Sequence, residues 1–207
     1  MSKKNIFDKY HKRYDAWYER NKFAYFSELK AIRKVLPKRG KGLEIGVGTG
    51  RFASALGIEY GLEPSLKMAR IAGERGVKVK IGRGEKLPFK NQEFDFCLVV
   101  ITISFVSEPG KVIKEIKRVL NKKGRLIIGM VDRESFLGRF YQKKKSEFYK
   151  EAHLFSPPQV VTLLKEEGFK KFLFWQTIFH LPHKIKEIEK PKTGFGEGGF
   201  VVICARI

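Results

Sequence analysis

Three glycines at alternate positions give the first indication of chemistry. Residues 43–52 read LEIGVGTGRF, which places Gly46, Gly48 and Gly50 directly after a short apolar run. Arg51 stands where the dinucleotide fingerprint G-x-G-x-x-G has its third glycine, so the spacing does not match that fingerprint. A glycine at position 50 flattens the turn and lets a bulky uncharged or zwitterionic ligand lie over the backbone. A glycine-rich turn can also be a tight strand-to-helix corner, so the pattern alone leaves both interpretations open.

Glu63 is the second candidate. It lies 63 − 44 = 19 residues after Glu44, at the end of an expected strand over residues 58–62. A carboxylate at this place can accept hydrogen bonds from both ribose hydroxyls of a nucleotide. The same residue precedes Pro64 at an expected helix start, where a carboxylate favours the helix dipole. Taken alone, the position fits either role.

The surrounding elements predict an α/β fold. Apolar runs alternate with helical patterns, which implies a doubly wound, mostly parallel, Rossmann-like sheet of seven strands. Strand, loop and strand without a long helix at the end predict a closing antiparallel hairpin, and a stripe recurring every three residues predicts a helix over 23–35. Alternation of Val77, Val79 and Ile81 with lysines indicates an edge strand. The expected strands are 43–45, 58–62, 77–81, 94–103, 126–131, 169–179 and 200–207, with further helices over 109–124 and 157–168.

The composition of the chain limits the classes of protein to which it can belong. The chain has 207 residues, 43% of them hydrophobic, and a formal net charge of +21. Its lysines are dispersed, so the charge favours a polyanionic partner such as nucleic acid without establishing one. Cys97 and Cys204 lie in apolar runs and predict buried thiols, with neither a disulfide framework nor a metal site. With no secretory h-region and no apolar run that could span a bilayer, we expect a cytoplasmic protein without a membrane partner.

Several motifs in order resemble one family. The sequence reads LEIGVGTG, GLEPSLKMAR and GRGEKLPF, then EFDFCLVVITISFV, IKRVLNKKGRLII and HLFSPPQVVTLLKEEGF. Together, over residues 42–168, these segments resemble the class I S-adenosylmethionine-dependent methyltransferases, most closely their type 11-like small-domain group. The resemblance implies S-adenosylmethionine as the cofactor.

The resemblance also implies site residues. The glycines would approach the methionine and ribose parts of the cofactor, Glu44 would anchor the turn and the amino group, and Glu63 would hold the ribose diol. The backbone near residue 84 would meet adenine, and residues after the fourth strand would face the sulfonium. The implied cofactor residues are Glu44, Gly46, Gly48, Gly50, Glu63, Pro64, Gly84, Glu85, Ile101 and Thr102.

The sequence departs from the family at two positions. Arg83 replaces the usual Asp of G-D-A-E, so a carboxylate for adenine N6 is missing and a backbone carbonyl could substitute. Ser104 replaces a frequent His, which removes a candidate general base. Methyl transfer from a sulfonium needs mainly positioning and desolvation, so a missing base does not exclude an enzyme.

Two aromatic segments are candidates for acceptor binding. Residues 10–20, YHKRYDAWYER, could fold over the cofactor as a lid, or their rings could simply dock a helix. The segment after the fifth expected strand carries more rings and His153, which could deprotonate an amine or serve structure. Acceptor candidates are Trp17, Tyr18, Phe105 and Tyr141, and the weak catalytic candidates are His153 and Tyr14.

Three functions follow from these features. The first is methyl transfer to an N, O or C nucleophile of a small molecule. The second is an RNA or protein methyltransferase that uses the basic surface, and the third is a cofactor-binding protein without turnover. We expect one domain over residues 1–207, with a helical lid over 1–40, a cofactor-binding half over 41–131 and a substrate-side half over 132–207.

Overall fold

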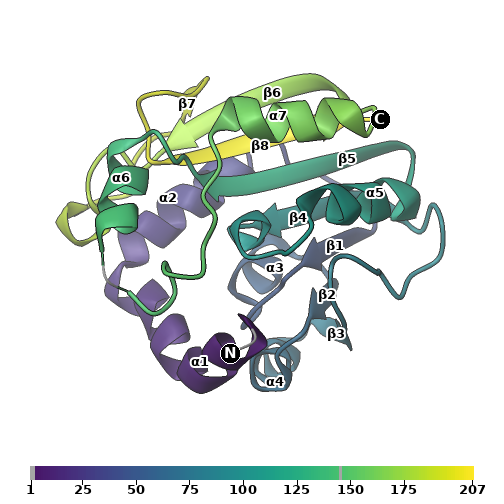
Figure 1. Ribbon diagram of the computed structural model, residues 1–207, viewed down its shortest axis with the longest axis horizontal. Coiled ribbons are helices and arrows are strands. Elements are labelled where there is room, and N and C mark those ends of the chain that lie inside the picture. Colours follow the sequence, from purple (N-terminus) through teal and green to yellow (C-terminus); the bar gives the residue numbers. More distant parts are fainter. Residues whose placement is uncertain (1–2, 145) are drawn as a thin grey trace.

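A single eight-stranded sheet organises the computed structural model, which describes residues 3–144 and 146–207 (Figure 1). The strand order is β3-β2-β1-β4-β5-β8-β6-β7. The sequence predicts seven strands; the eighth, β7, has only two residues and is too short to give a pattern. The strands are β1 Gly42–Ile45, β2 Tyr60–Glu63, β3 Lys78–Ile81, β4 Phe94–Val100, β5 Leu120–Val131, β6 Lys170–Thr177, β7 Lys192–Thr193 and β8 Phe200–Arg206.

The first five strands pair in parallel, and the last three pair antiparallel. The predicted doubly wound, mostly parallel sheet with an antiparallel end is therefore confirmed. β8 lies between β5 and β6, and β3 forms the edge that its alternating sequence predicts.

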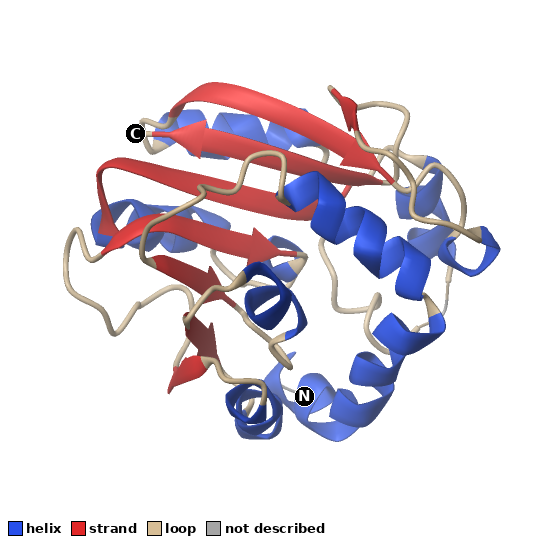
Figure 2. Cartoon of the chain, turned by 180° about the vertical axis from the view of Figure 1, so that it is seen from behind, coloured by secondary structure: helices blue, strands red, loops and turns tan. Residues whose placement is uncertain are grey.

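Helices cover both faces of the sheet, because its central strands are apolar on both sides. Figure 1 shows α5 and α7 on the near face, and Figure 2 shows α2 crossing in front of the opposite face. The two core clusters match these layers, one centred on side chains of α2 and the other on side chains of α5 and α7. The helices are α1 Lys3–Arg20, α2 Lys22–Ile32, α3 Arg51–Leu56, α4 Leu66–Glu74, α5 Pro109–Val119, α6 Phe136–Lys143 and α7 Pro157–Glu166.

The N-terminal segment is helical, as predicted, but its buried face differs from the predicted stripe. Phe26 belongs to the every-third-residue pattern, yet its side chain is 44% exposed. A helix repeats every 3.6 residues, so its buried face shifts away from a strict period of three. The buried face of α2 keeps Leu29 and Ile32 of the predicted stripe and adds Tyr25 and Glu28.

The largest errors in the predicted boundaries lie at the end of β4 and between α5 and β5, which begins at Leu120 rather than at residue 126. The fourth strand ends at Val100 rather than at residue 103, because the chain turns at Ile101 into a short 3₁₀ helix over Thr102–Ser104. Gly124 does not close α5, which ends at Val119. Leu120 is already extended and pairs with Phe94 of β4, so burial of Leu120 in the sheet ends the helix earlier.

No helix among residues 3–144 and 146–207 is long and apolar enough to cross a membrane.

Substitution of Leu98 tests the core of the central strand. Leu98 in β4 is fully buried, whereas Leu173 in β6 is 55% exposed. We expect Leu98→Ala to lower the free energy of unfolding by about 2–5 kcal/mol, the cost of a buried cavity. Leu173→Ala should change it by no more than about 0.5 kcal/mol. Equilibrium urea unfolding of both variants measures the difference, and equal losses would contradict this assignment of faces.

Candidate active site

The first cavity opens at the carboxyl ends of the parallel strands, where ligands bind in open α/β sheets. It is bounded by the loop after β1, the end of β2, the turn after β4 and α1, which carries Phe7 and Tyr14 over it. The remaining lining residues are Ile45, Gly46, Gly48, Leu62, Glu63, Pro64, Ser65, Met68, Gly82, Arg83, Gly84, Glu85, Val100, Ile101, Thr102, Phe105 and Val106.

The glycine loop shapes this cavity at two positions. Gly48 has a φ of +55°, and a Cβ placed on it would lie 3.7 Å from Tyr14 and 3.9 Å from Met68, two other lining residues. A side chain at this position would therefore occupy the cavity. Gly50 has a φ of +81°, and its Cβ would lie 2.9 Å from the Cα of Ala72. Gly50 is thus required by close packing of the loop against α4 and does not line the cavity.

The Glu63 carboxylate holds the loop and the start of α4 together. One oxygen accepts a hydrogen bond from the Gly48 N–H and the other from the Ser65 N–H, each at 2.9 Å. Burial raises the pKa of Glu63 to about 7, and these two backbone hydrogen bonds act against that rise. Each carboxylate oxygen has a second lone pair. Glu63 can therefore accept further hydrogen bonds from a ligand in the cavity.

Glu44 lies beneath the loop and does not line the cavity. Burial raises the pKa of Glu44 well above its usual value, opposed by a backbone hydrogen bond from Ala53. Its Oε2 atom is buried and has no hydrogen-bond partner among the residues that the structure describes. An orphaned acceptor of this kind usually marks a strained position or a polar group supplied by a ligand or water.

The turn after β4 has an unusual backbone. Ile101 has a φ of +61°, although a β-branched residue strongly disfavours the left-handed region. A hydrogen bond from its N–H to the Gly129 carbonyl at 2.7 Å holds it there, and the Thr102 hydroxyl bonds to the Gly46 carbonyl at 3.2 Å. Strained residues of this kind cluster at functional sites. Both Ile101 and Thr102 line the cavity.

Arg83 lies at the rim of the cavity. Its side chain is 60% exposed and its Nε is 3.6 Å from the Glu85 carboxylate. Gly84 and Glu85 also line the cavity, so the backbone around them is available to a ligand.

A second cavity of about 310 Å³ lies beside the first and shares one wall with it. Phe7, Tyr14, Ile101 and Phe105 line both cavities. The acceptor candidates Trp17, Tyr18, Phe105 and Tyr141 all line the second cavity, together with Arg13, Arg20, Asn21, Glu28, Val131, Leu137, Phe140, Lys144, Ser146, Phe148, Tyr149, Pro182 and His183. This volume is near the lower end of small-molecule sites, about 300–1,000 Å³.

The two weak catalytic candidates are placed differently. The Tyr14 hydroxyl is at the shared wall, 2.8 Å from the Tyr18 hydroxyl. Burial raises the pKa of Tyr14 well above its usual value, so its phenol stays protonated. His153 is exposed, packs edge-on against Phe155 and lines neither cavity.

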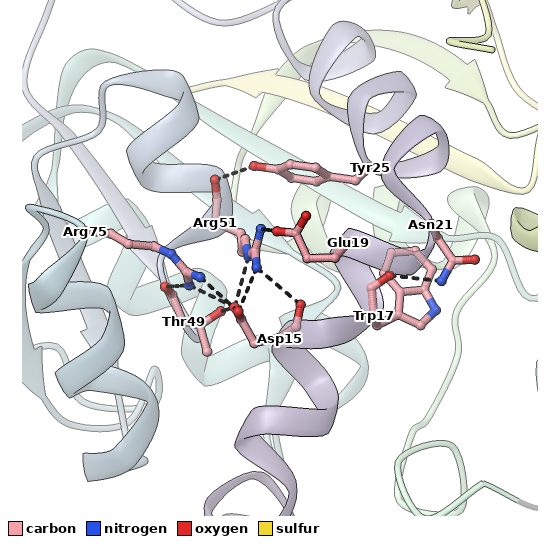
Figure 3. A network of polar contacts seen from close by, with 8 residues as sticks. All are labelled: Asp15, Trp17, Glu19, Asn21, Tyr25, Thr49, Arg51 and Arg75. Carbon is pink, nitrogen blue, oxygen red and sulfur yellow. Dashed lines mark hydrogen bonds and ion pairs between the residues drawn. The ribbon is translucent and has the colours of Figure 1, made fainter. Parts of the chain in front are cut away.

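A polar network fixes α1 over the site (Figure 3). The Asp15 carboxylate accepts hydrogen bonds from the Thr49 hydroxyl at 2.6 Å, from Arg51 Nη2 at 2.7 Å and from Arg75 Nη1 at 2.8 Å. Burial opposes ionisation of Asp15, but the hydrogen bonds outweigh it and hold its pKa well below the usual range. Arg51 also pairs with Glu19. The glycine loop, α3 and the end of α4 are thereby joined to the helix that covers the cavity.

A Rossmann-like sheet with a glycine loop, a buried carboxylate at the end of β2 and a covering helix defines a nucleotide-cofactor enzyme. A methyltransferase domain model matches residues 43–128. A crystal structure of an S-adenosylmethionine-dependent methyltransferase from Thermotoga maritima, described as a possible histamine N-methyltransferase, is 50% identical and covers 98% of each chain with a TM-score of 0.95.

Two relatives identified by sequence align with two thirds or more of this chain. An uncharacterized protein of Methanocaldococcus jannaschii is 50% identical over 97% of this chain and 98% of its own length. The demethylmenaquinone methyltransferase of Thermotoga maritima is 30% identical over 69% of this chain and 74% of its own length. The chain belongs to the class I S-adenosylmethionine-dependent methyltransferases, and S-adenosylmethionine is its cofactor.

The residues that line the first cavity fit that cofactor. Gly48 has no side chain to fill the cavity, and the Glu63 carboxylate has lone pairs that can accept hydrogen bonds from a ligand there. Apolar side chains such as Leu62 and Met68 line the cavity beside them. Eight of the ten cofactor residues implied by the sequence line this cavity, and Glu44 and Gly50 lie behind it. Phe7, Ser65 and Met68 were missed. Phe7, Tyr14 and Tyr18, spaced by seven and four residues, gave the helical signal that could have found Phe7.

Replacement of Glu63 tests cofactor binding. Glu63→Gln keeps the shape but turns one acceptor into a donor that faces a backbone N–H. We expect the affinity for S-adenosylhomocysteine, measured by calorimetry, to fall by roughly 1.5–3 kcal/mol. In the wild type, affinity should fall as pH is lowered through about 7, because Glu63 then becomes protonated. Glu59→Gln, an exposed change nearby, is the control, and unchanged affinity in Glu63→Gln would remove Glu63 from the site.

Replacement of Asp15 tests the attachment of α1. We expect Asp15→Asn to lower the free energy of unfolding at neutral pH by about 1–3 kcal/mol, because Arg51 and Arg75 lose a charged partner. The folded pKa of Asp15 is depressed, so its contribution is present above its unfolded pKa and is lost in strong acid. The difference between variant and wild type should therefore vanish at low pH.

The matched control for Asp15 is Glu19→Gln. Glu19 pairs with the same Arg51, but its side chain is 70% exposed, so its loss should cost about 0–1 kcal/mol. Urea unfolding across pH measures both variants. An Asp15→Asn protein as stable as Glu19→Gln would show that the network does not hold α1.

Proposed function

We propose that this enzyme transfers a methyl group to a small molecule that occupies the second cavity. The observation that carries the proposal is the shared wall, in which Phe7, Tyr14, Ile101 and Phe105 face both cavities. When bound, S-adenosylmethionine supplies an electrophilic methyl group on a sulfonium. An acceptor in the second cavity would lie beside the cofactor site and away from bulk water.

In this proposal the chain contributes binding and orientation. Glu63 and the backbone at Gly48 hold the ribose side of the cofactor, and the backbone around Gly84 meets the adenine. Ile101 and Thr102 lie at the reacting end, where the strained turn brings the β4 terminus against the acceptor cavity. Residues 6–20 of α1 act as the lid, joined to the loop through Asp15.

The residues at the shared wall favour catalysis by positioning. Tyr14 is a neutral phenol, which can donate or accept a hydrogen bond but is no general base at neutral pH. The cavity walls hold the nucleophile in line with the methyl group. Exclusion of water removes solvent that would otherwise compete for the nucleophile's lone pair. The acceptor nitrogen, oxygen or carbon would be oriented by Tyr14 and Tyr18, whose hydroxyls form a hydrogen bond with each other.

The relatives support a small acceptor. The demethylmenaquinone methyltransferase of Thermotoga maritima is named for a small molecule, as is the possible histamine N-methyltransferase. The net charge of +21 favours RNA instead, by electrostatic attraction to phosphates. That attraction weakens steeply as salt rises, so salt separates the two functions.

The test is a labelled-methyl assay at near-physiological salt with a panel of small metabolites and with total RNA. We expect label on at least one metabolite, and RNA binding that disappears as salt rises. Label on RNA at enzyme-like rates and on no metabolite would overturn the small-molecule function. Binding of S-adenosylmethionine without label on any acceptor would instead support a cofactor-binding protein without turnover.

A further inference from the structure

The second cavity contains one buried carboxyl group that the fold does not use. Glu28 lies on α2 with 5% of its surface exposed, and it lines this cavity. Among the described residues, no hydrogen bond or ion pair joins its carboxyl group to another side chain or to the backbone. Side-chain polar atoms that are both fully buried and unpaired occur there only at Glu44 and Thr177. The Glu28 carboxyl is therefore open to the cavity.

Such a carboxyl destabilises the fold. Burial alone raises the pKa of Glu28 to about 8. The folded pKa lies above the unfolded value, so at alkaline pH the folded protein must hold an unpaired buried charge. Its neighbours on the buried face of α2, such as Tyr25, Leu29 and Ile32, are apolar or aromatic. No structural role accounts for a glutamate at this place.

The walls around Glu28 are aromatic. Trp17, Tyr18, Phe148 and Tyr149 line the cavity, and Tyr149 stacks on Tyr141 with ring centroids 4.0 Å apart. Burial raises the pKa of each of these tyrosines, so their rings stay neutral. Ring faces attract cations and tolerate apolar groups. A lone carboxyl among ring faces is complementary to a positively charged nitrogen on a small organic molecule.

The other charged groups lie at the rim. Arg13 and Arg20 of α1, Lys144 after α6 and His183 of the 3₁₀ helix Pro182–Lys184 also line the cavity, and all four are exposed. No ion pair joins any of them to Glu28 among the residues described. The two arginines and Lys144 place positive charge at the mouth, whereas Glu28, the one acidic residue among the described lining residues, lies inside. A ligand with one cationic end would enter with that end first, whereas a second cationic end would be repelled.

We propose that Glu28 binds the cationic nitrogen of the methyl acceptor, and that the acceptor of this enzyme is a small monoamine. Because an ammonium ion has no lone pair, the Glu28 carboxylate would also take its proton. The neutral amine would then accept the methyl group as the methyl–sulfur bond breaks, leaving S-adenosylhomocysteine and a methylated ammonium ion. The inference rests on the proposed function, because it assigns the second cavity to the acceptor. It makes Glu28 a residue that selects the substrate by charge, with the aromatic walls enclosing the apolar remainder of the amine.

Calorimetry in the presence of saturating S-adenosylhomocysteine tests this without turnover. The probes are phenethylamine and histamine, with 2-phenylethanol as the neutral counterpart of phenethylamine. We expect the wild type to prefer phenethylamine to 2-phenylethanol. Glu28→Gln should weaken binding of the amines about 10-fold or more, with little change for the alcohol. Glu147→Gln, an exposed change of the same charge in the segment beside the cavity, should bind like the wild type.

Stability provides a second readout. Glu28→Gln removes the cost of this buried acid, so its thermal midpoint should exceed that of the wild type by a margin that grows as pH rises from 4.5 to about 8 and is constant above. A structural role for Glu28 would give the opposite result, a loss of stability in the variant. If Glu28 serves ligand binding rather than folding, Glu28→Gln should be more stable than the wild type and should bind amines more weakly.

A measurement on the wild type alone guards against a variant that fails to fold. Benzyltrimethylammonium keeps its charge at every pH, so its binding reports only on the protein. Its affinity should fall as pH is lowered from about 9 to about 6, because the Glu28 carboxylate is then protonated. The Tyr14, Tyr18, Tyr141 and Tyr149 phenols stay protonated throughout. A parallel measurement on His183→Gln repeats the comparison with no imidazole at the cavity.

The outcomes separate the two proposals. Failure of the amines to bind the wild type, equal binding of phenethylamine and 2-phenylethanol, or undiminished binding to Glu28→Gln would overturn the role of Glu28. A pH-independent affinity of the quaternary probe would do the same. Amines that bind through Glu28 but receive no label in the methyl assay would leave this site in place and contradict the proposed methyl acceptor.

Discussion

The active site depends on a single carboxylate, that of Asp15. Three segments far apart in the sequence present donors to it: Thr49 from the glycine loop, Arg51 from α3 and Arg75 after α4. With α1 attached, Phe7 and Tyr14 close the cofactor cavity and form the wall that both cavities share. Arg51 occupies the position at which dinucleotide-binding loops have a glycine, and here it serves to attach the covering helix.

Charge is distributed unevenly between the surface and the interior. The net charge is +21, yet no Lys or Arg is buried among the described residues, whereas Glu28, Glu44, Glu63 and Asp132 are. Three of these carboxyl groups lie in or directly behind the two cavities. The strongly basic composition therefore describes the outside of the molecule, whereas the ionisable groups buried at the two cavities are carboxyl groups. Burial raises the pKa of Glu63 to about 7 and that of Glu28 to about 8, so a cation beside either group would favour its charged form.

The sequence predicted most of the sheet, because buried parallel strands and their glycine turns leave strong local patterns. It also indicated the residues that the structure gathers around the first cavity, through motifs at fixed places after β1, β2 and β4. Three features depended on tertiary structure. The two-residue β7 exists only by pairing with β6, Leu120 is extended because it pairs with Phe94, and Glu28 looks like an ordinary polar residue on a helix until the buried face of α2 is known. The exposed Phe26 shows how a period of three misplaced that face.

The position of β8 affects the order in which the sheet can form during synthesis on the ribosome. β8 follows all the other strands in sequence but lies between β5 and β6. Among the residues that the structure describes, it supplies the only pairing that joins β6 to the parallel half of the sheet. Until residues 200–206 emerge, β5 presents an open hydrogen-bonding edge, the kind of edge that invites wrong partners. Closing it requires contacts between distant parts of the chain, which form slowly. Gly199, directly before β8, lies close to Leu137 of α6, which lines the second cavity. A nascent chain can thus assemble its cofactor loop early, but its second cavity is complete only after β8 has paired with β5 and β6.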